Sequence, residues 1–553
     1  MNNAEIADSF SLLSKLMDIH GANSFKAKSY ANTAFQIDRL DTELSALSRD
    51  AIAQQKGIGE SAGRKIIELL DTGRMTDLDE LLKKTPAGIL ELMKIKGIGP
   101  KKIAVIWNEL GIESPGELLY ACEENRLIHY KGFGEKSQQS IAEAIQFYLS
   151  NQGSFLYAQV EPLAHQFMHE LPILLQTEVA LSGDMLRQNE VLDTLEWVVA
   201  LSPEEVLDKM KNLPVWEPLQ SDDSSVIFRY AHQLNVCFYC CDAASFEATC
   251  FKHSCNETFW NEWQRLYPET PLNRKEEEVF ESLSLPYIPS ALRDQPEVLE
   301  IARQGQLPSL IRYEDIRGII HNHSTWSDGS NSIEEMAQAC IRHGFEYLVM
   351  SDHSVSSFYA NGLNADRIKQ QQEEIDALNE KLKPFRIFKS IECDILNDGS
   401  LDYPDSVLKT FDLVICSVHQ NLKMSEDKAM ERILRAIENP YTRILGHCSG
   451  RLLLSRKAYP LRYPELIAAC RQYNVVIEIN ANPRRLDIDW RWLHECRKQN
   501  VLCSVNPDAH HTDGILDIRY GVLAAQKGLL TAGMNLSSYS LTEFETILKN
   551  KVH

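Results

Sequence analysis

From residue 316 onward, the sequence alternates short apolar runs with segments of helical periodicity. Strands followed by amphipathic helices form parallel sheets, because each helix carries the chain back across the sheet. Seven such units in one stretch predict a barrel whose active site lies at the C-terminal ends of the strands. The apolar runs span 317–320, 347–350, 385–390, 413–417, 443–445, 475–479 and 501–505, and the helical segments include 333–342, 366–382, 428–438 and 464–473.

Side chains that bind metals follow these apolar runs, except after the sixth, where Asn480 and Asn482 stand. One such residue would have an ordinary structural interpretation, but a series does not, because buried unpaired histidines and carboxylates are costly. Their number exceeds the ligands of one ion, which predicts two or three divalent ions, and imidazole with carboxylate favours Zn²⁺, Mn²⁺ or Fe²⁺. The candidate ligands and catalytic residues are His321, His323, Asp328, His353, Glu392, His419, His447, Asp508 and His510.

Such a metal cluster favours hydrolysis of phosphoesters, because it activates a bound water and binds phosphoryl oxygens. Arginines follow the fifth and sixth apolar runs, at Arg451, Arg456, Arg484 and Arg485. They are candidates for binding phosphate oxygens. The alternative is that they are solvated loop arginines.

Residues 1–150 show helical periodicity that is interrupted three times by a glycine, an apolar residue and a second glycine, each near lysines. Backbone N–H groups of such a turn, at the start of a helix, can approach a phosphate. The candidate contacts are Gly57, Gly59, Gly97, Gly99, Lys101, Lys102, Gly132, Gly134 and Lys136. The repetition resembles helix-hairpin-helix elements, which hold DNA by its backbone without reading sequence. The alternative is an all-helical packing module with glycine turns.

The formal net charge of −21 argues against nucleic-acid binding by the chain as a whole. Residues 1–150 contribute only −3 of this charge, so DNA contact is assigned to them. Thirteen scattered cysteines fit reduced thiols, and the sequence predicts neither a membrane span nor a signal peptide. We therefore predict a cytoplasmic protein without a membrane partner. The sequence does not determine the oligomeric state, for which a monomer is favoured.

The middle of the chain has a different pattern. Residues 151–268 combine a helical segment, 155–175, with strand-like runs, which predicts an α+β domain. A nucleotidyl transferase needs clustered carboxylates at the ends of such strands to hold Mg²⁺, and none are found. Residues 269–312 are rich in proline and predict a linker before a C-terminal domain of 313–553. The strand-like runs are 178–182, 195–200 and 234–239.

The ligand pattern of the C-terminal half resembles the PHP (polymerase and histidinol phosphatase) phosphoesterases. The whole chain, including the segment Leu285–Arg293, resembles the bacterial family X DNA polymerases with a fused PHP domain. This resemblance implies three parts: an all-α helix-hairpin-helix domain, an α+β nucleotidyltransferase-like domain and a distorted (β/α)7 barrel.

The resemblance also implies how three ions would be held in the barrel. One ion would bind His321, His323, Glu392 and Asp508, a second Glu392, His419 and His447, and a third Asp328, His353 and His510. Related PHP domains act as Mn²⁺-dependent 3′–5′ exonucleases, in some cases with abasic-site endonuclease or 3′-phosphatase activity. The same activity is therefore expected here.

The middle domain departs from the family pattern of a Gly-Ser turn, an Asp-x-Asp strand and a third Asp. The turn resembles Gly183-Asp184, and the aspartate positions fall on Thr194, Glu196 and Asn235. Because Thr and Asn replace two of three carboxylates, we predict that polymerisation is lost and that the domain is a scaffold or a residual DNA platform.

The resemblance places at Lys65 the lysine that forms a Schiff base in family members with deoxyribose-phosphate lyase activity. The alternative is a solvated lysine on a helix.

Three functions are compatible with these features. The first is a metal-dependent DNA 3′–5′ exonuclease or end-processing phosphoesterase in repair. The second is a small-molecule phosphatase of the histidinol-phosphate type, which would not need the glycine-lysine turns. The third is a catalytically silent DNA-binding scaffold, and the complete set of ligands speaks against it.

Overall fold

The computed structural model describes residues 1–38, 40, 42–55, 58–149, 153–231 and 233–549. It divides into two compact units, which are described separately. The first comprises Met1–Glu123 and Leu127–Leu149, and the second comprises Glu124–Arg126 and Ser150–His553. In the described part of the chain, no helix has both the length and the apolar character of a membrane span.

The first unit is helical, as predicted. Gly59 and Gly99 are the N-caps of α4 and α7, so the helices begin where the glycine turns end. Gly97 and Gly132 have φ values of +93° and +94°, a conformation that favours glycine. The helices are α1 (Asn3–Ile19), α2 (Ser24–Ile37), α3 (Arg49–Ala53), α4 (Glu60–Thr72), α5 (Thr76–Lys84), α6 (Ala87–Leu92), α7 (Pro100–Asn108), α8 (Pro115–Glu123) and α9 (Glu135–Leu149).

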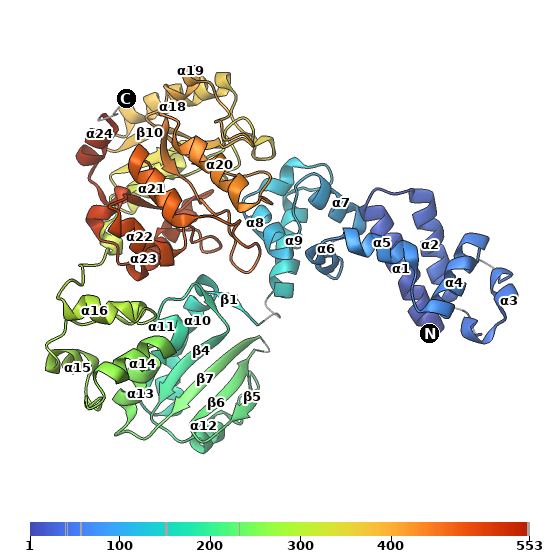
Figure 1. The fold of residues 1–553 in the computed structure, drawn as a ribbon, viewed down its shortest axis with the longest axis horizontal. Coiled ribbons are helices and arrows are strands. Elements are labelled where there is room, and N and C mark those ends of the chain that lie inside the picture. Colours follow the sequence, from blue (N-terminus) through green and yellow to red (C-terminus); the bar gives the residue numbers. More distant parts are fainter. Residues whose placement is uncertain (39, 41, 56–57, 150–152, 232, 550–553) are drawn as a thin grey trace. The chain divides into compact units, whose positions relative to one another are not determined.

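The middle domain, here the described residues of 151–268, contains a five-stranded sheet in the order β2-β4-β7-β6-β5 (Figure 1). The predicted strand-like runs correspond to β2, β4 and β7, whereas β5 and β6 were not predicted. Residues 217–221 of β5 are exposed, so this edge strand has little apolar signal. The elements are β1 (Phe155–Leu156), α10 (Tyr157–Leu175), β2 (Val179–Ser182), α11 (Gly183–Leu186), β3 (Val191–Leu192), β4 (Thr194–Val199), α12 (Pro203–Met210), β5 (Trp216–Ser221), β6 (Ser225–Tyr230), β7 (Leu234–Cys240), α13 (Phe246–His253) and α14 (Glu257–Leu266).

The segment predicted as a linker, 269–312, contains helices α15 (Glu276–Ser282) and α16 (Glu297–Arg303). Their apolar side chains share a core with α13 and α14, in which Phe280 packs against Phe251 and Trp263. The prolines therefore separate short helices that pack on the middle domain.

The C-terminal part is the predicted seven-stranded parallel barrel, with strands in sequence order from β8 to β14. A parallel bridge between Asn322 and Ala509 joins the first and last strand ends and nearly closes the barrel. The strands are β8 (Gly318–Ile319), β9 (Tyr347–Met350), β10 (Arg386–Asp394), β11 (Leu413–Ser417), β12 (Thr442–Leu445), β13 (Val476–Asn480) and β14 (Cys503–Asn506). The helices are α17 (Ile333–Arg342), α18 (Ala365–Lys381), α19 (Asp405–Leu408), α20 (Glu426–Ile437), α21 (Tyr463–Tyr473), α22 (Leu493–Lys498), α23 (Ile518–Lys527) and α24 (Leu541–Lys549).

Candidate metal centre

The nine candidate ligands lie together at the C-terminal ends of the barrel strands. Eight are buried, and the side chain of His419 is only 4% exposed. The parallel register brings the strand ends to the same edge, so residues far apart in sequence become neighbours. Potential ligand atoms from these residues form four groups, each within 4.8 Å. The groups are His323, Asp328, His353 and His510; His321, His323 and Asp508; His321, Glu392 and His447; and His353, Glu392 and His419.

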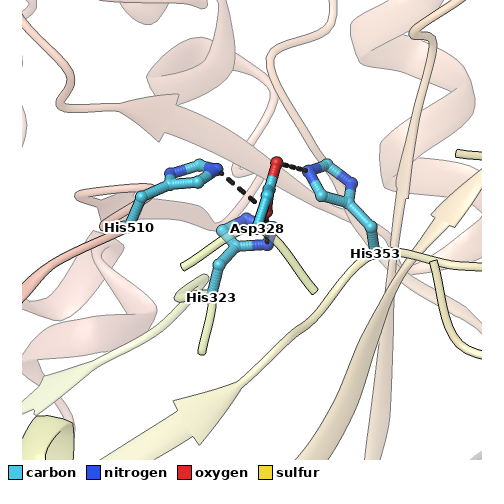
Figure 2. Close-up of side chains that lie close together, drawn as sticks. All are labelled: His323, Asp328, His353 and His510. Atoms are coloured by element: carbon cyan, nitrogen blue, oxygen red, sulfur yellow. Dashed lines mark ion pairs between the residues drawn. The ribbon is translucent and has the colours of Figure 1, made fainter. Parts of the chain in front are cut away.

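Asp328 is at the centre of the first group (Figure 2). Its Oδ2 lies 3.5 Å from Nε2 of His353, and its Oδ1 lies 3.5 Å from Nε2 of His510. The same Oδ1 lies 3.9 Å from Nδ1 of His323. Three imidazoles therefore surround one carboxylate, as expected of a transition-metal site.

Glu392 has the same central position in the two groups on its side of the cluster. Its Oε1 lies 2.8 Å from Nε2 of His447 and 3.1 Å from Nε2 of His419, and its Oε2 lies 3.0 Å from Nδ1 of His353. The ligands predicted for one ion, Glu392, His419 and His447, are thus divided between two groups: His447 belongs to one, His419 to the other, and Glu392 to both. Glu392 would therefore serve as a ligand in both groups.

Two further carboxylates contact the Nδ1 atoms of two candidate ligands. The sequence analysis did not assign these carboxylates. Oε2 of Glu478 lies 2.6 Å from Nδ1 of His321, and Oδ1 of Asp394 lies 2.5 Å from Nδ1 of His419. In both histidines Nε2 faces Glu392. Such carboxylates fix the tautomer and orientation of ligating histidines. Glu478 could have been found as a charged residue inside an otherwise apolar strand, and Asp394 as lying two residues beyond Glu392 on the same strand face.

Electrostatics in the cluster depends on these contacts. Burial alone would lower the pKa of His419, but Glu392 and Asp394 raise it to about 10. Burial alone would raise the pKa of Glu478, but its pairing with His321 holds it below its usual value. Burial, together with His510 and His353, lowers the pKa of His323 to about 3. His323 is therefore neutral, the form in which imidazole binds a metal.

The residues fit divalent ions. Nδ1 of His323, Oδ2 of Asp328, Oε2 of Glu392 and Nε2 of His510 are buried and lack a hydrogen bond of good geometry within the described chain, even where another ligand atom lies close. Buried polar atoms without partners are costly unless they coordinate something. His321 and Asp508 also have positive φ values, +66° and +55°, and such strain concentrates at functional sites. The cluster is therefore able to bind metal.

The candidate phosphate-binding arginines differ in position. Arg451 donates to Asp489 and to the carbonyl oxygens of Arg485 and Leu486, so its guanidinium supports the loop after β13. Arg456 donates to the carbonyl oxygen of Gly450. Nε of Arg485 lies 3.7 Å from Oδ2 of Asp508, which places this arginine beside the cluster. Among Arg451, Arg456 and Arg485, Arg485 is thus the best placed to bind phosphate.

The glycine turns of the first unit expose their backbone. A Cβ added at the glycines of the second or third turn would meet no atom within 4 Å, so a phosphate could approach closely. Lys101 and Lys136 are exposed, and Lys102 Nζ donates to Ser137 Oγ at 2.9 Å, which links the two turns. Lys65 Nζ lies 2.5 Å from Asp77 Oδ2. Gly57 lies outside the described residues.

The predicted polymerase positions lie on neighbouring strands, where Thr194 of β4 is the register partner of Asn235 of β7. Glu196 faces the turn before α11: its Oε2 accepts from the Asp184 N–H at 3.0 Å, and its Oε1 accepts from the Tyr239 hydroxyl at 2.7 Å. A Cβ at Gly183 would lie 1.6 Å from Glu196 Oε2, so the carboxylate fills the space over this turn. In the described part of the middle domain, no three metal-binding side chains gather.

Comparisons with known proteins match three regions of the chain. Residues 1–75 match a helix-hairpin-helix domain, residues 89–146 a SAM-like helix-hairpin-helix tandem, and residues 320–510 a PHP domain. Two probable phosphatases match a shorter part. The one from Thermoanaerobacter sp. (strain X514) is 30% identical over 29% of this chain and 62% of its own length. The one from Caldanaerobacter subterraneus subsp. tengcongensis is 28% identical over 29% of this chain and 60% of its own length.

The DNA polymerase/3′-5′ exonuclease PolX of Bacillus subtilis (strain 168) is 32% identical over 99% of this chain and 100% of its own length. The similarity thus includes the middle domain as well as the parts that match family models. Together with the barrel and its ligand cluster, this match shows that the chain belongs to the bacterial family X DNA polymerases that carry a C-terminal PHP domain.

Proposed function

We propose that this protein is a hydrolase that removes nucleotides from DNA 3′ ends in repair, with its chemistry in the PHP barrel. The cluster of nine ligands with buried unpaired atoms supports this proposal most strongly. The similarity to a relative named as a 3′-5′ exonuclease supports the choice of substrate and direction.

In this proposal, the cluster holds two to three divalent ions, Mn²⁺, Zn²⁺ or Fe²⁺. As the family resemblance implies, the first would be held by His321, His323, Glu392 and Asp508, the second by Glu392, His419 and His447, and the third by Asp328, His353 and His510. The four groups in the structure contain the same nine residues in overlapping sets. Bound ions would supply an activated water and polarise the phosphoryl oxygens. Glu478 and Asp394 keep Nε2 of their histidines facing the cluster, and Arg485 binds a non-bridging phosphate oxygen.

The N-terminal region, residues 1–150, binds DNA in this proposal. Open glycine backbone and exposed Lys101 and Lys136 support contact with phosphates regardless of sequence. We further propose that the protein acts as a monomer in the cytoplasm, with the middle domain at 151–268 and the barrel at 313–553. Lyase activity at Lys65 is tested by borohydride trapping on a 5′-deoxyribose-phosphate substrate. Lys65→Ala should abolish labelling, and absence of labelling in the wild type would end that part of the proposal.

Polymerisation is lost in this proposal. Thr194 and Asn235 cannot supply the carboxylates of an Mg²⁺ site, and Glu196 occupies the turn at Gly183. A polymerase would need this turn free for the phosphates of an incoming nucleotide. The middle domain then serves as a scaffold.

Incubation of the protein with end-labelled primed DNA, Mn²⁺ and all four dNTPs tests the proposed exonuclease activity and the proposed loss of polymerisation in one experiment. Degradation without extension is expected, and His323→Ala and Asp508→Ala should abolish it. Extension of the primer would contradict the loss of polymerisation. Full degradation by both variants would contradict a barrel active site.

The probable phosphatases among the relatives favour one alternative, hydrolysis of small phosphomonoesters by the same cluster. The charge-reversed double variant Lys101→Glu/Lys136→Glu distinguishes the two functions. It should lose activity on DNA and keep any activity on p-nitrophenyl phosphate. A wild-type protein that hydrolyses only p-nitrophenyl phosphate would favour the alternative.

A further inference from the structure

A third buried carboxylate, Asp352, lies next to the cluster but contributes to none of its ligand groups. It follows β9 and accepts five hydrogen bonds. Oδ1 accepts from the N–H of Ser324 at 2.7 Å and from the N–H and hydroxyl of Ser327 at 3.2 and 2.5 Å. Oδ2 accepts from the Ser324 hydroxyl at 2.7 Å and from Gln371 Nε2 of α18 at 2.6 Å.

These donors come mainly from the loop that connects His323 with Asp328. The loop folds on itself, since the N–H groups of Ser327 and Gly329 both donate to the Ser324 carbonyl oxygen at 3.0 Å. A Cβ at Gly329 would lie 2.6 Å from the His323 carbonyl oxygen, so the turn leaves no room for a side chain. Asp352 occupies the inside of this turn and satisfies its polar groups.

The Ser327 hydroxyl lies near two carboxylates, those of Asp328 and Asp352. It lies 2.5 Å from Asp352 but 3.3 Å from Asp328, and it has one proton to donate. Asp352 therefore accepts the hydrogen bond from Ser327, and both oxygens of Asp328 remain directed at His353 and His510.

Asp352 and His353 are adjacent in sequence and act on the same ligand from two directions. His353 contacts Asp328 directly, whereas Asp352 holds the backbone that carries Asp328. We propose that Asp352 is a positioning residue: it fixes the Ser324–Asp328 turn and thereby assembles the group of His323, Asp328, His353 and His510. This inference rests on the proposed metal-dependent function.

Metal binding tests the inference without relying on catalysis. Mn²⁺ stoichiometry and affinity would be measured by calorimetric titration of the full chain for the wild type, Asp352→Ala, Asp328→Ala and the double variant. Each single variant should bind one ion fewer than the wild type, and the double variant should lose no more, because both changes affect the same ion. Two losses that add would overturn the proposal, as would an unchanged ion count in Asp352→Ala.

The milder variant Asp352→Asn keeps the size of the side chain and covers the case in which alanine prevents folding. It should weaken the affinity for this one ion by about 10- to 100-fold, the usual effect of removing an outer hydrogen-bond partner. Equal weakening at every ion, or none, would contradict the proposal. Asp412→Asn is the matched control. Asp412, just before β11, also accepts from a backbone N–H, that of Lys389 in β10, but it belongs to none of the ligand groups. If wild-type protein binds its ions but leaves DNA intact, only the proposed function fails.

Discussion

Single residues in the barrel separate into candidate metal ligands and residues that hold those ligands in place. Glu478 illustrates the second kind, because it contacts Nδ1 of His321 and also accepts from the backbone N–H of His447 and the side chain of Asn506. One buried carboxylate of β13 thus contacts two candidate ligands, which follow β8 and β12, and one residue of β14. Its negative charge also balances a site that will receive cations.

Glu478→Gln should therefore weaken metal binding although no ligand is changed. The amide keeps the size of the side chain but cannot accept a charge-assisted bond from His321, which is then free to change tautomer. We expect Mn²⁺ affinity and the exonuclease rate to fall by about 10- to 100-fold. Titration with Mn²⁺ and a gel assay measure the two effects. Glu495→Gln, a change in the surface helix α22, should leave both unchanged, and an unaffected Glu478→Gln would contradict the prediction.

At the level of secondary-structure elements, the barrel was predictable because its strands are buried on both faces and are therefore continuous apolar runs. All seven strands lie at the predicted runs. Edge strand β5 was not predictable, since its pattern is polar, and helices α15 and α16 are too short to show a clear period.

The candidate ligands were predictable for the same reason that the strands were: most of them follow an apolar run within a few residues. Glu478, Asp394 and Asp352 were missed because a sequence does not show which polar side chain faces another. Their roles depend on contacts between residues far apart in the chain, such as the 2.6 Å contact of Glu478 with His321.

In the proposed contact with DNA, the exposed lysines beside the glycine turns are expected to bind phosphates. Lys101→Ala should lower affinity for duplex DNA to a similar degree for every sequence, because a phosphate contact carries no base information. The slope of log affinity against log salt should fall by about 1. Fluorescence anisotropy over a salt series measures both quantities. Lys15→Ala, an exposed change in α1, should alter neither, and a sequence-dependent loss would contradict backbone binding.

At the scale of the second unit, the middle domain and the barrel are joined by buried charges. Lys527, at the end of α23, is 1% exposed. Its ammonium group donates to Asp294 at 2.5 Å and to the carbonyl oxygen of Arg187 at 2.7 Å. Arg187 follows α11 and also pairs with Asp294 at 2.9 Å. The turn at Gly183 therefore leads, through α11 and Arg187, into the contact with the barrel.

Lys527→Met should destabilise this unit strongly, because it leaves buried hydrogen-bond acceptors without their donor. Breaking a buried ion pair costs about 3–5 kcal/mol, and Arg187 keeps Asp294 partly paired, so we expect the lower end of this range. Chemical unfolding measures the change in the free energy of unfolding. The exposed pair Lys211–Asp208 provides a control, and Lys211→Met should change stability little. Equal effects of the two variants would contradict a structural role for the buried lysine.

A second contact between the middle domain and the barrel predicts how stability depends on pH. Glu190 accepts from Trp490 Nε1 at 3.0 Å and from Arg491 at 2.8 Å. Burial alone would raise the pKa of Glu190, but Arg491 lowers it from 4.5 to about 2. A lowered folded-state pKa means that the stabilisation is complete above the unfolded value of 4.5 and is lost as the pH falls through about 2.

Glu190→Gln should therefore destabilise the protein at neutral pH by at most on the order of 3 kcal/mol. The difference from the wild type should shrink steadily below pH 4.5, where protons begin to neutralise the carboxylate in the unfolded chain. Urea unfolding at pH 7, 5.5, 4.5 and 3.5, with both proteins at equal ionic strength, measures this difference. A difference that stays constant over the series would show that the charge of Glu190 does not stabilise the contact.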